Sequence, residues 1–364
     1  MRELLDRIGY VPRRGVWELT LRCNLRCLHC GSRAGAPRGD ELTDEETYRL
    51  IDQLVKLGMK SITLSGGEPL MRENWPQIAE RFRKRGVRVN MISNGLNADR
   101  ATIRRMKDAG MSNYGVSIDG SEQSHDFVRG RPGAYRAAMQ ALENCQAEGF
   151  PAACVSFVNT KNYHELEELA ETLCRHGVKD WQVQYGRPMG NLGEHLDLVC
   201  KPETILDLLP RLARLYRQYE GRMRVYASDS LGYYSEDEEL FRGGRSIAGV
   251  WSGCLAGVRV IGIEANGNIE GCLSMQTDEF VEGNIRQEAL EKIWTKPGNF
   301  RYTRGFTLEQ LGPGCRACDL ADVCRGGCSW TAWMEGGRSG KFDNPYCYYR
   351  QAKLYEKAHG PSGE

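Results

Sequence analysis

Three cysteines, Cys23, Cys27 and Cys30, lie in a Cys-x3-Cys-x2-Cys loop directly after a predicted strand at residues 16–21. Thiolates are the usual protein ligands of iron–sulfur clusters, and three on so short a loop can bind three irons of a four-iron cluster. The fourth iron would have no ligand in this loop. Since an open iron is useful only when another molecule binds there, the spacing predicts a catalytic cluster. For the loop taken alone, the alternative is a structural zinc site completed by His29.

The composition limits the classes of protein to which the chain can belong. Its 364 residues are enough for one large domain and a smaller one, and 41% of them are apolar, which allows a sizeable core. Lys and Arg together number 49, against 48 Asp and Glu. The net charge of +1 gives no reason to expect nucleic acid or a membrane surface as a partner.

The amino terminus and the cysteine usage indicate a cytoplasmic protein. Residues 1–15 are charged and contain no apolar run, so we expect no signal peptide. No stretch of the sequence is long and apolar enough to span a bilayer. Fourteen cysteines in a chain without a secretory signal point to metal or cluster ligands rather than disulfides. A reducing cytoplasm is the compartment that suits such thiols.

Strand and helix patterns alternate six times in the first half of the chain, which predicts an α/β fold with a parallel sheet. Six units are too few for a full eight-unit barrel, so we expect a partial (β/α)6 TIM-like barrel with its site at the carboxyl ends of the strands. The predicted strands are 16–21, 60–64, 87–92, 114–118, 152–158 and 181–185, and the predicted helices are 44–57, 75–85, 99–109, 133–147, 164–175 and 201–219.

Polar or glycine-rich stretches follow these predicted strands, where function usually lies in such folds. They are the cysteine loop and residues 66–69, 93–94, 117–120 and 184–188. Taken alone, a glycine pair indicates a plain turn and Glu68 a surface carboxylate. One β/α unit after the three-cysteine loop, the same residues indicate a cofactor site.

Seven more cysteines are concentrated near the carboxyl terminus: Cys254, Cys272, Cys315, Cys318, Cys324, Cys328 and Cys347. The first two bracket a predicted β-hairpin with arms at 259–263 and 268–271, joined through Asn266-Gly267. A single zinc ribbon would use four thiolates and leave three unexplained. Among the other cysteines, Cys145, Cys154 and Cys174 lie inside predicted elements and should be small buried hydrophobic residues.

The cysteine loop and the Gly-Gly-Glu-Pro stretch, in this order, resemble the leading motifs of the radical S-adenosylmethionine enzymes. The resemblance covers about residues 15–190. It implies a [4Fe–4S] cluster on the three cysteines, whose open iron chelates the amino and carboxylate groups of S-adenosylmethionine. Electron transfer to the sulfonium then releases a 5′-deoxyadenosyl radical that abstracts a substrate hydrogen, chemistry that the cofactor supplies and the protein positions.

The resemblance also assigns cofactor contacts to residues after the strands. Gly66, Gly67 and Glu68, followed by Pro69, would meet the ammonium group. The ribose would meet Ser93 and Asn94, and the ribose or methionine carboxylate would meet Ser117 and Arg129. Position 29 usually carries an aromatic residue whose backbone faces the adenine, so His29 is a mild departure. Gln184, at the end of the sixth strand, completes the predicted cofactor-binding set.

The carboxyl-terminal cysteine spacing resembles the SPASM domain of radical enzymes that mature peptides and proteins. It implies two auxiliary [4Fe–4S] clusters, and so three clusters in all. The outer one would be held by Cys315, Cys318, Cys324 and Cys347, and the inner one by Cys254, Cys272 and Cys328. Some relatives complete the inner cluster with a cysteine just before the first, but residues 246–253 contain none. That cluster would keep an open iron or use another ligand, with Cys200 as an outside candidate.

These motifs divide the chain into five predicted segments. An amino-terminal extension spans 1–14, the radical core 15–220, a linker or part of a substrate cleft 221–250, the SPASM domain 251–350 and a tail 351–364. Within the linker, the acidic run at 236–239 is expected to be a solvated loop.

Most relatives of this architecture modify a ribosomally made peptide or a protein side chain, and this analogy predicts a peptide-modifying maturase. The alternatives are a small-molecule dehydrogenase or epimerase and, in another class, a non-catalytic iron–sulfur or zinc-binding module. Only 22 residues precede Cys23, too few for a leader-binding domain. Either a separate small protein presents the peptide, or the barrel and residues 221–250 bind it. The electron donor should be of the flavodoxin or ferredoxin type.

Leu273 bears on the kind of reaction. In sulfatase maturases an Asp directly after the second cysteine of the hairpin region is the proposed base for Ser or Cys oxidation. The matching residue here is Leu273, which cannot accept a proton. We therefore expect a reaction other than formylglycine formation. Another loop could supply the base instead, and Glu270 and Asp278 are the nearest carboxylates in sequence.

Overall fold

One ten-stranded sheet runs through the chain, with the strands in the order β10-β9-β8-β1-β2-β3-β4-β5-β6-β7. The computed structural model describes residues 9–242, 249–336 and 340–360. The strands are β1 (Arg14–Glu18), β2 (Ser61–Ser65), β3 (Arg88–Ser93), β4 (Asn113–Ser117), β5 (Ala152–Val158), β6 (Asp180–Tyr185), β7 (Arg224–Ala227), β8 (Val260–Ile263), β9 (Asn268–Glu270) and β10 (Gly283–Asn284). Strands β1 to β7 pair in parallel, which confirms the predicted α/β fold with a parallel sheet.

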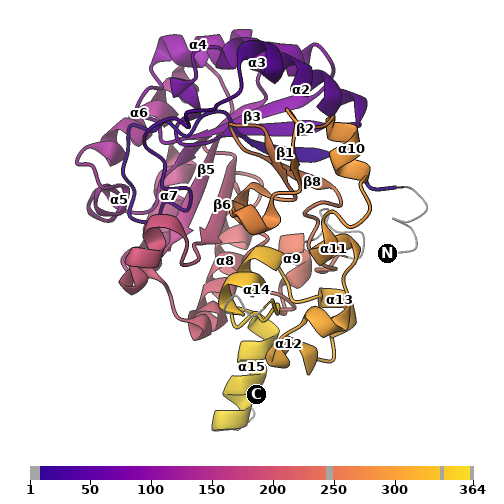
Figure 1. Ribbon diagram of the computed structural model, residues 1–364. Coiled ribbons are helices and arrows are strands. Elements are labelled where there is room, and N and C mark those ends of the chain that lie inside the picture. The colour runs from indigo at the N-terminus through magenta and orange to yellow at the C-terminus, as the bar shows by residue number, and fades with distance from the viewer. Residues whose placement is uncertain (1–8, 243–248, 337–339, 361–364) are drawn as a thin grey trace.

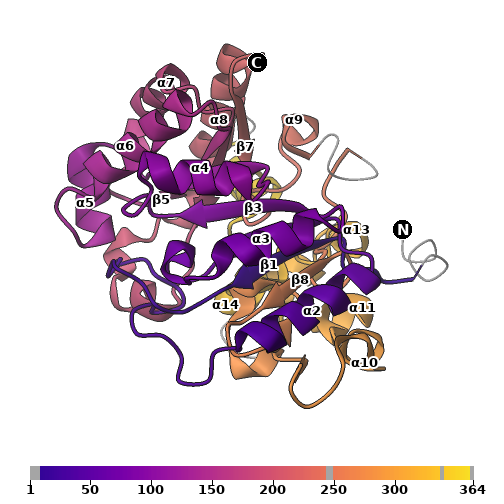
Figure 2. The same cartoon turned by 90° about the horizontal axis from the view of Figure 1, so that it is seen from above.

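Helices connect the parallel strands and cover the sheet. They are α2 (Asp44–Lys56), α3 (Trp75–Arg83), α4 (Arg100–Asp108), α5 (Glu122–Arg129), α6 (Ala134–Ala147), α7 (Leu166–Arg175) and α8 (Ile205–Tyr219). Figure 2 shows α2, α3 and α4 lying side by side along the sheet. Helix α2 illustrates why these segments are helical. Thr43 and Glu46 form a capping box at its start. Its inner face buries Leu50, Ile51 and Leu54 against the sheet.

The carboxyl-terminal third consists mostly of short elements. Its helices are α9 (Glu238–Arg242), α10 (Leu290–Thr295), α11 (Arg301–Arg304), α12 (Pro313–Arg316), α13 (Ala321–Cys324), α14 (Ser329–Glu335) and α15 (Tyr348–His359). In Figure 1, α12, α14 and α15 lie below the sheet, whereas α10 lies near α2. The predicted hairpin is confirmed, since β8 and β9 pair in antiparallel register. Strand β8 also pairs in parallel with β1, with Trp17 opposite Ile263, so the cysteine-rich region continues the barrel sheet.

Two parts of the chain differ from the sequence prediction. Helix α5 was not expected; it begins at Ser121, whose side chain caps it. The predicted linker at 221–250 contributes β7 to the sheet, and its acidic run is not fully solvated. Glu238 is buried, and its carboxylate accepts hydrogen bonds from the backbone N–H groups of Tyr234 (2.9 Å) and Trp251 (3.0 Å), which offset the cost of burying it. Residues 243–248 of this stretch, and the chain ends at 1–8 and 361–364, lie outside the described residues.

Candidate active site

The three-cysteine loop leaves the carboxyl end of β1 and closes on itself. The N–H of Cys23 donates to the carbonyl of Gly35 (3.0 Å), and the N–H of Gly35 donates to Leu21 (3.0 Å). The Cys30 sulfur accepts from the N–H of Ala34 at 3.3 Å. Burial raises the pKa of the Cys27 thiol to about 11, so binding iron there would release a proton.

The glycine pair after β2 packs against the chain that leads into Cys23. The N–H of Gly67 donates to the carbonyl of Thr20, and that of Glu68 donates to Arg22, both at 2.8 Å. A Cβ on Gly66 would lie 2.4 Å from the Thr20 oxygen, and one on Gly67 would lie 2.4 Å from the Arg22 oxygen. These glycines are therefore required by contact with their own chain, whatever they bind in addition.

Replacing Gly67 by alanine should disorder the cysteine loop. Because the new Cβ would meet backbone atoms rather than a flexible side chain, the segment before Cys23 must shift. We expect iron bound at this loop to be largely lost, measured by iron and sulfide analysis of the reconstituted protein. Gly39→Ala is the matched control: neither Gly39 nor Gly67 has a positive φ, and nothing lies within 4 Å of the Cβ position of Gly39. Equal iron loss in both variants would contradict the assignment.

Glu68 joins the ends of β2 and β3. Its buried carboxylate accepts hydrogen bonds from the Ser93 hydroxyl (2.8 Å), the Asn94 N–H (2.9 Å) and the Leu70 N–H (3.1 Å). Tyr114 donates in turn to the Ser93 oxygen at 2.8 Å. The structure thus brings the predicted residues Glu68, Ser93 and Asn94 together, as expected for the carboxyl ends of neighbouring parallel strands. Pro69 follows directly and begins a 3-10 turn.

Asn94 also links this group to the cysteine loop. Its side-chain amide donates to the Asn24 side chain at 2.7 Å. On the opposite side, Asn191 donates from its side chain to the carbonyl of Cys27 and from its backbone to that of Cys30, both at 2.9 Å. Sequence reasoning missed Asn191, since its partners lie more than 150 residues away. Hydrogen bonds from residues that follow β3 and β6 therefore hold the loop from two sides.

Arg129 lies beside Cys27 and forms an ion pair with Asp119 that the sequence analysis did not predict. Its guanidinium donates to both oxygens of the buried Asp119, at 2.7 and 3.2 Å. Burial opposes ionisation of Asp119, but the Arg129 charge outweighs it and lowers the pKa of that carboxyl to about 2. The same positive charge favours the Cys27 thiolate. Ser117 is buried at the end of β4, two residues before Asp119. Arg129 is thus already paired, while its predicted role toward S-adenosylmethionine stays a prediction.

His29 packs against the end of β5. Its ring stacks on Phe157 with centroids 4.5 Å apart and an interplanar angle of 11°. Burial lowers the pKa of His29 to about 3, so the ring is neutral, and its Nδ1 atom is buried without a hydrogen-bond partner among the described residues. Gln184 is the β6 neighbour of Phe157, and its side-chain oxygen accepts from Gln182 at 3.2 Å. An unpartnered nitrogen beside the cysteine loop suits a polar ligand there.

The four predicted outer-cluster cysteines line one small hollow of about 30 Å³. They are Cys315, Cys318, Cys324 and Cys347. The N–H groups of Asn344 and Leu320 donate to the Cys315 and Cys318 sulfurs, at 3.2 and 3.4 Å. Because backbone N–H donors to cluster sulfurs are typical of iron–sulfur sites, this donor set fits a [4Fe–4S] cluster.

The three predicted inner-cluster cysteines also gather, at the hairpin and the start of α14. Burial raises the pKa of Cys272 to about 11, and Cys254 contributes to that rise. Burial raises the pKa of Cys328 to about 12, with contributions from both other thiols. Cys200, the outside candidate, is instead buried beside Arg187.

All fourteen cysteines are free thiols, in keeping with the expectation of ligands rather than disulfides. Over residues 9–242, 249–336 and 340–360, no three Cys, His, Asp or Glu side chains converge on a point that would hold a single metal ion. A four-iron cluster makes a different demand, since each thiolate binds a separate iron. Buried Cys145 and Cys154 and half-buried Cys174 pack in the core, as predicted.

A polar cleft of about 400 Å³ lies between the cysteine loop and the hairpin region. One wall is formed by Gly31, Ser32 and Arg33, and the other by residues that follow β8 and β9, including Gln276 and Asp278. The first wall begins directly after Cys30, and the second includes residues 276–278, which follow Cys272. The cleft therefore lies between segments that adjoin two predicted cluster ligands.

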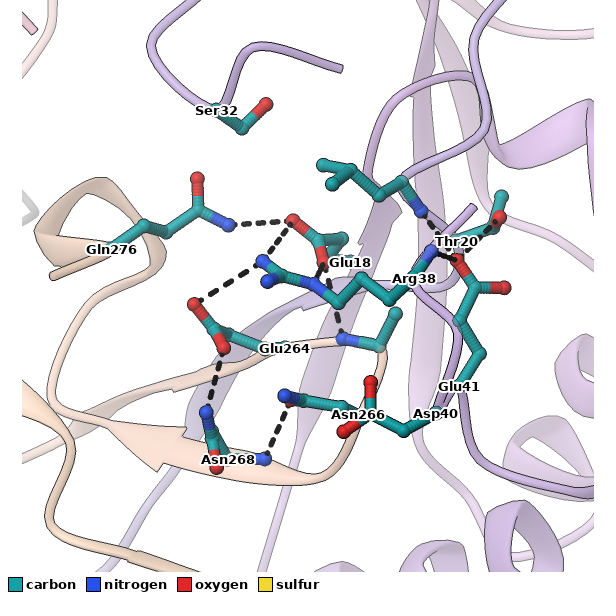
Figure 3. A network of polar contacts seen from close by, with 12 residues as sticks. Glu18, Thr20, Ser32, Arg38, Asp40, Glu41, Glu264, Asn266, Asn268 and Gln276 are labelled. Atoms are coloured by element: carbon teal, nitrogen blue, oxygen red, sulfur yellow. Dashed lines mark hydrogen bonds and ion pairs between the residues drawn. The ribbon is translucent and has the colours of Figure 1, made fainter. Parts of the chain in front are cut away.

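Arg38 lines this cleft and is the centre of a network of polar contacts (Figure 3). It donates to Glu18 at 2.8 Å and pairs with Glu264 at 3.3 Å, while Gln276 donates to Glu18 at 2.6 Å. Glu18 belongs to β1, and Glu264 follows β8, so this network joins the barrel to the cysteine-rich region. Beneath it, burial and the Glu264 and Glu18 charges raise the pKa of Glu270 to about 10, which keeps that carboxyl neutral.

A parallel partial barrel with three thiols after its first strand, extended by a cysteine-rich hairpin region, is the architecture of radical S-adenosylmethionine enzymes with auxiliary clusters. Comparison with family models agrees: residues 17–191 match the radical SAM superfamily, and residues 254–319 match SPASM, an iron–sulfur cluster-binding domain. The chain belongs to the radical SAM superfamily and carries a SPASM domain. These domains imply [4Fe–4S] clusters and S-adenosylmethionine binding.

Individual relatives divide between two kinds of chemistry. The chain is 30% identical over 355 residues to an AdoMet-dependent heme synthase of Methanosarcina barkeri, covering 94% of this chain and 98% of that protein. It is 28% identical over 330 residues to mycofactocin maturase MftC of Mycolicibacterium smegmatis, covering 88% and 79%. Streptococcus suis SuiB, solved with its precursor peptide SuiA, has a similar fold, with a TM-score of 0.72, 15% identity and coverage of 94% and 77%.

Every helix within the described ranges is too short or too polar to cross a membrane.

Proposed function

We propose that this protein is a radical enzyme that modifies a ribosomally made peptide or a protein side chain. The observation that carries the proposal is the cleft between Ser32 and Gln276, whose lining is polar and of mixed charge. Side-chain amides and charged groups suit a peptide backbone and its polar side chains better than a large apolar ring. The fold shared with SuiB and the sequence similarity to mycofactocin maturase support the same substrate class.

In this proposal the protein holds its cofactors with the residues already described. Cys23, Cys27 and Cys30 would hold the first [4Fe–4S] cluster, and the carboxyl-terminal cysteines would hold two auxiliary ones. Bound at the first cluster, S-adenosylmethionine supplies the radical chemistry. The chain's own residues shape the site for this cofactor. Glu68 fixes the ends of β2 and β3, and the charge of Arg129 favours the thiolate form of Cys27. A flavodoxin- or ferredoxin-type donor would supply the electron, in a reducing cytoplasm that keeps the thiols free.

A second candidate is a small-molecule reaction on a tetrapyrrole. The similarity to the heme synthase spans nearly the whole of both chains, and a Fe-coproporphyrin III synthase of the same organism is 28% identical over 367 residues. This observation favours a substrate other than a peptide.

One experiment separates the two candidates. The reconstituted, reduced enzyme is incubated with S-adenosylmethionine and either the cognate precursor peptide or Fe-coproporphyrin III. We expect a mass change in the peptide together with 5′-deoxyadenosine formation. A mass change confined to the porphyrin would replace the peptide proposal with the tetrapyrrole one.

The residue at position 273 predicts which reaction does not occur. Offered a sulfatase-motif peptide with Ser or Cys, the enzyme should leave it unchanged, because Leu273 cannot act as a base. The two carboxylates nearest to Leu273 in sequence differ in their exposure to the cleft: Asp278 lines it, whereas Glu270 is fully buried. A trappable aldehyde, with a loss of two hydrogens from the Ser peptide or of two hydrogens and replacement of sulfur by oxygen in the Cys peptide, would show that Asp278 or another loop supplies the base.

How the peptide is presented can be tested by a pull-down. We propose that a separate small protein delivers it, or that the barrel binds it directly. Tight binding of the precursor by the enzyme alone would support direct binding. Binding only after a leader-binding partner is added would support delivery.

A further inference from the structure

Arg187 follows β6, two residues after Tyr185, at the end of the sheet where the site lies. Its side chain is 2% exposed. Its Nε, Nη1 and Nη2 atoms are all buried, and none has a hydrogen-bond partner within the described part of the chain. The nearest carboxylate, that of Glu335, is 4.0 Å from Nη1, too far for a hydrogen bond.

The other buried arginines of the described residues donate to protein acceptors, although the Nε atom of Arg242 lacks one. Arg129 donates to both oxygens of Asp119. Arg211 is bonded to both oxygens of Glu167. A buried charge normally requires such partners, because removal from water costs several kcal/mol. Arg187 therefore has an unused capacity for an acceptor with two oxygens.

Two tyrosines hold the Arg187 guanidinium in place. Its central carbon lies 3.5 Å from the ring centre of Tyr346 and 5.3 Å from that of Tyr185. Aromatic faces bind a guanidinium through its plane and leave its N–H edge for hydrogen bonds. The Tyr185 hydroxyl is also buried without a hydrogen-bond partner among the described residues, so a second donor lies nearby.

The position of Arg187 connects the two halves of the proposed site. Two residues further along, the Met189 side chain packs against Gly31, next to Cys30. On the other side, Glu335 ends α14, the helix that begins after Cys328. The guanidinium thus lies between the loop that would hold the first cluster and the region that would hold the auxiliary ones.

We propose that Arg187 binds a carboxylate of the substrate, with the Tyr185 hydroxyl as an additional donor. The proposal rests on the proposed function in taking the substrate to bind between the cluster sites. Arg187 donates to both oxygens of the carboxylate. The planar guanidinium matches this two-oxygen geometry, whereas a lysine ammonium does not. The carboxylate belongs to a peptide, at its terminus or on an acidic side chain, or to a small molecule such as a carboxylated porphyrin. Arg187 is a substrate-binding residue in either case.

The direct test uses trifluoroacetate as the probe and 19F line broadening as the readout, on the reconstituted holoenzyme. We expect saturable broadening that acetate competes away and neutral acetamide does not. In Arg187→Gln the apparent Kd should rise about tenfold or more, the usual effect of losing a charged hydrogen bond. Arg187→Lys should weaken binding less. Arg211→Gln, which removes a buried but fully paired arginine, should leave binding unchanged.

Other outcomes overturn the proposal. If wild-type enzyme gives no saturable broadening, or if Arg187→Gln binds trifluoroacetate as wild type does, Arg187 is a structural cation held by the tyrosines. Should Arg187→Gln fail to fold, the comparison rests on Arg187→Lys and on the acetate and acetamide competition in wild type, where equal competition by both compounds overturns the proposal.

A second set of measurements distinguishes the sources of the carboxylate. Precursor peptide with a free or amidated terminus, and Fe-coproporphyrin III or its methyl ester, are compared by apparent KM. We expect a rise of about tenfold on blocking the carboxylate that Arg187 binds, and no further rise in Arg187→Gln. Because trifluoroacetate binding is measured without turnover, failure of the proposed reaction and failure of the carboxylate site give different results.

Discussion

Replacing Cys23, Cys27 and Cys30 together by alanine should abolish 5′-deoxyadenosine formation from S-adenosylmethionine under dithionite. The reason is that the open iron is proposed to belong to a cluster on this loop, whose backbone is held by the loop's own hydrogen bonds and by those from Asn191. The hollow lined by four other cysteines lies on separate elements. With the three clusters proposed above, we expect bound iron to fall by about a third, to the content of two clusters. Iron and sulfide analysis and chromatography of the reaction products measure the two effects.

Cys174→Ala is the control for this prediction. Cys174 is a half-buried residue of α7 and belongs to none of the proposed ligand sets. Both the iron content and the cleavage of S-adenosylmethionine should be unchanged in this variant. Continued cleavage in the triple variant would assign the reaction to another cluster and contradict the site described here.

Glu68→Ala should show the second large effect, on both stability and cofactor binding. The substitution leaves buried donors of Ser93, Asn94 and Leu70 without their acceptor, which we expect to cost about 3 kcal/mol or more of the free energy of unfolding. It also removes the carboxylate proposed to meet the ammonium group. S-adenosylmethionine binding should weaken more than iron content falls, as measured by equilibrium dialysis and iron analysis.

Glu41→Ala is a matched control for Glu68→Ala. The Glu41 carboxylate also accepts three hydrogen bonds, from the Thr20 hydroxyl and the N–H groups of Leu21 and Arg38, but it has no proposed cofactor contact. It should lower stability without changing S-adenosylmethionine affinity. If Glu68→Ala destabilises the protein to a similar extent and leaves cofactor binding intact, Glu68 has only a structural role.

Local patterns were enough to predict much of the architecture and of the candidate site. The cysteine loop, the Gly-Gly-Glu-Pro stretch and the hairpin through Asn266-Gly267 are all short-range features, because thiolate spacing and turn chemistry act over a few residues. Periodicity gave the six parallel strands for the same reason. Parallel pairing then placed Glu68 beside Ser93 and Asn94 without any knowledge of contacts.

The glycine pair shows the limit of that reasoning. Sequence reasoning assigned Gly66 and Gly67 to close approach by a cofactor. In the structure both are already required by contacts with Thr20 and Arg22, more than 40 residues earlier in the chain. Helix α5 was missed as well, and with it the pairing of Arg129 with Asp119.

The sequence by itself determined the superfamily, the parallel sheet and the cysteine sets, since each of these follows from residue types at short spacing. Only the tertiary structure decided which distant segments meet. Strand β8 lies against β1, so Glu18 and Glu264 share Arg38, and Arg187 lies between Tyr346 and Glu335 without a hydrogen-bond partner among the described residues. Such contacts depend on the register and packing of elements that are far apart in the chain, and no local pattern encodes them.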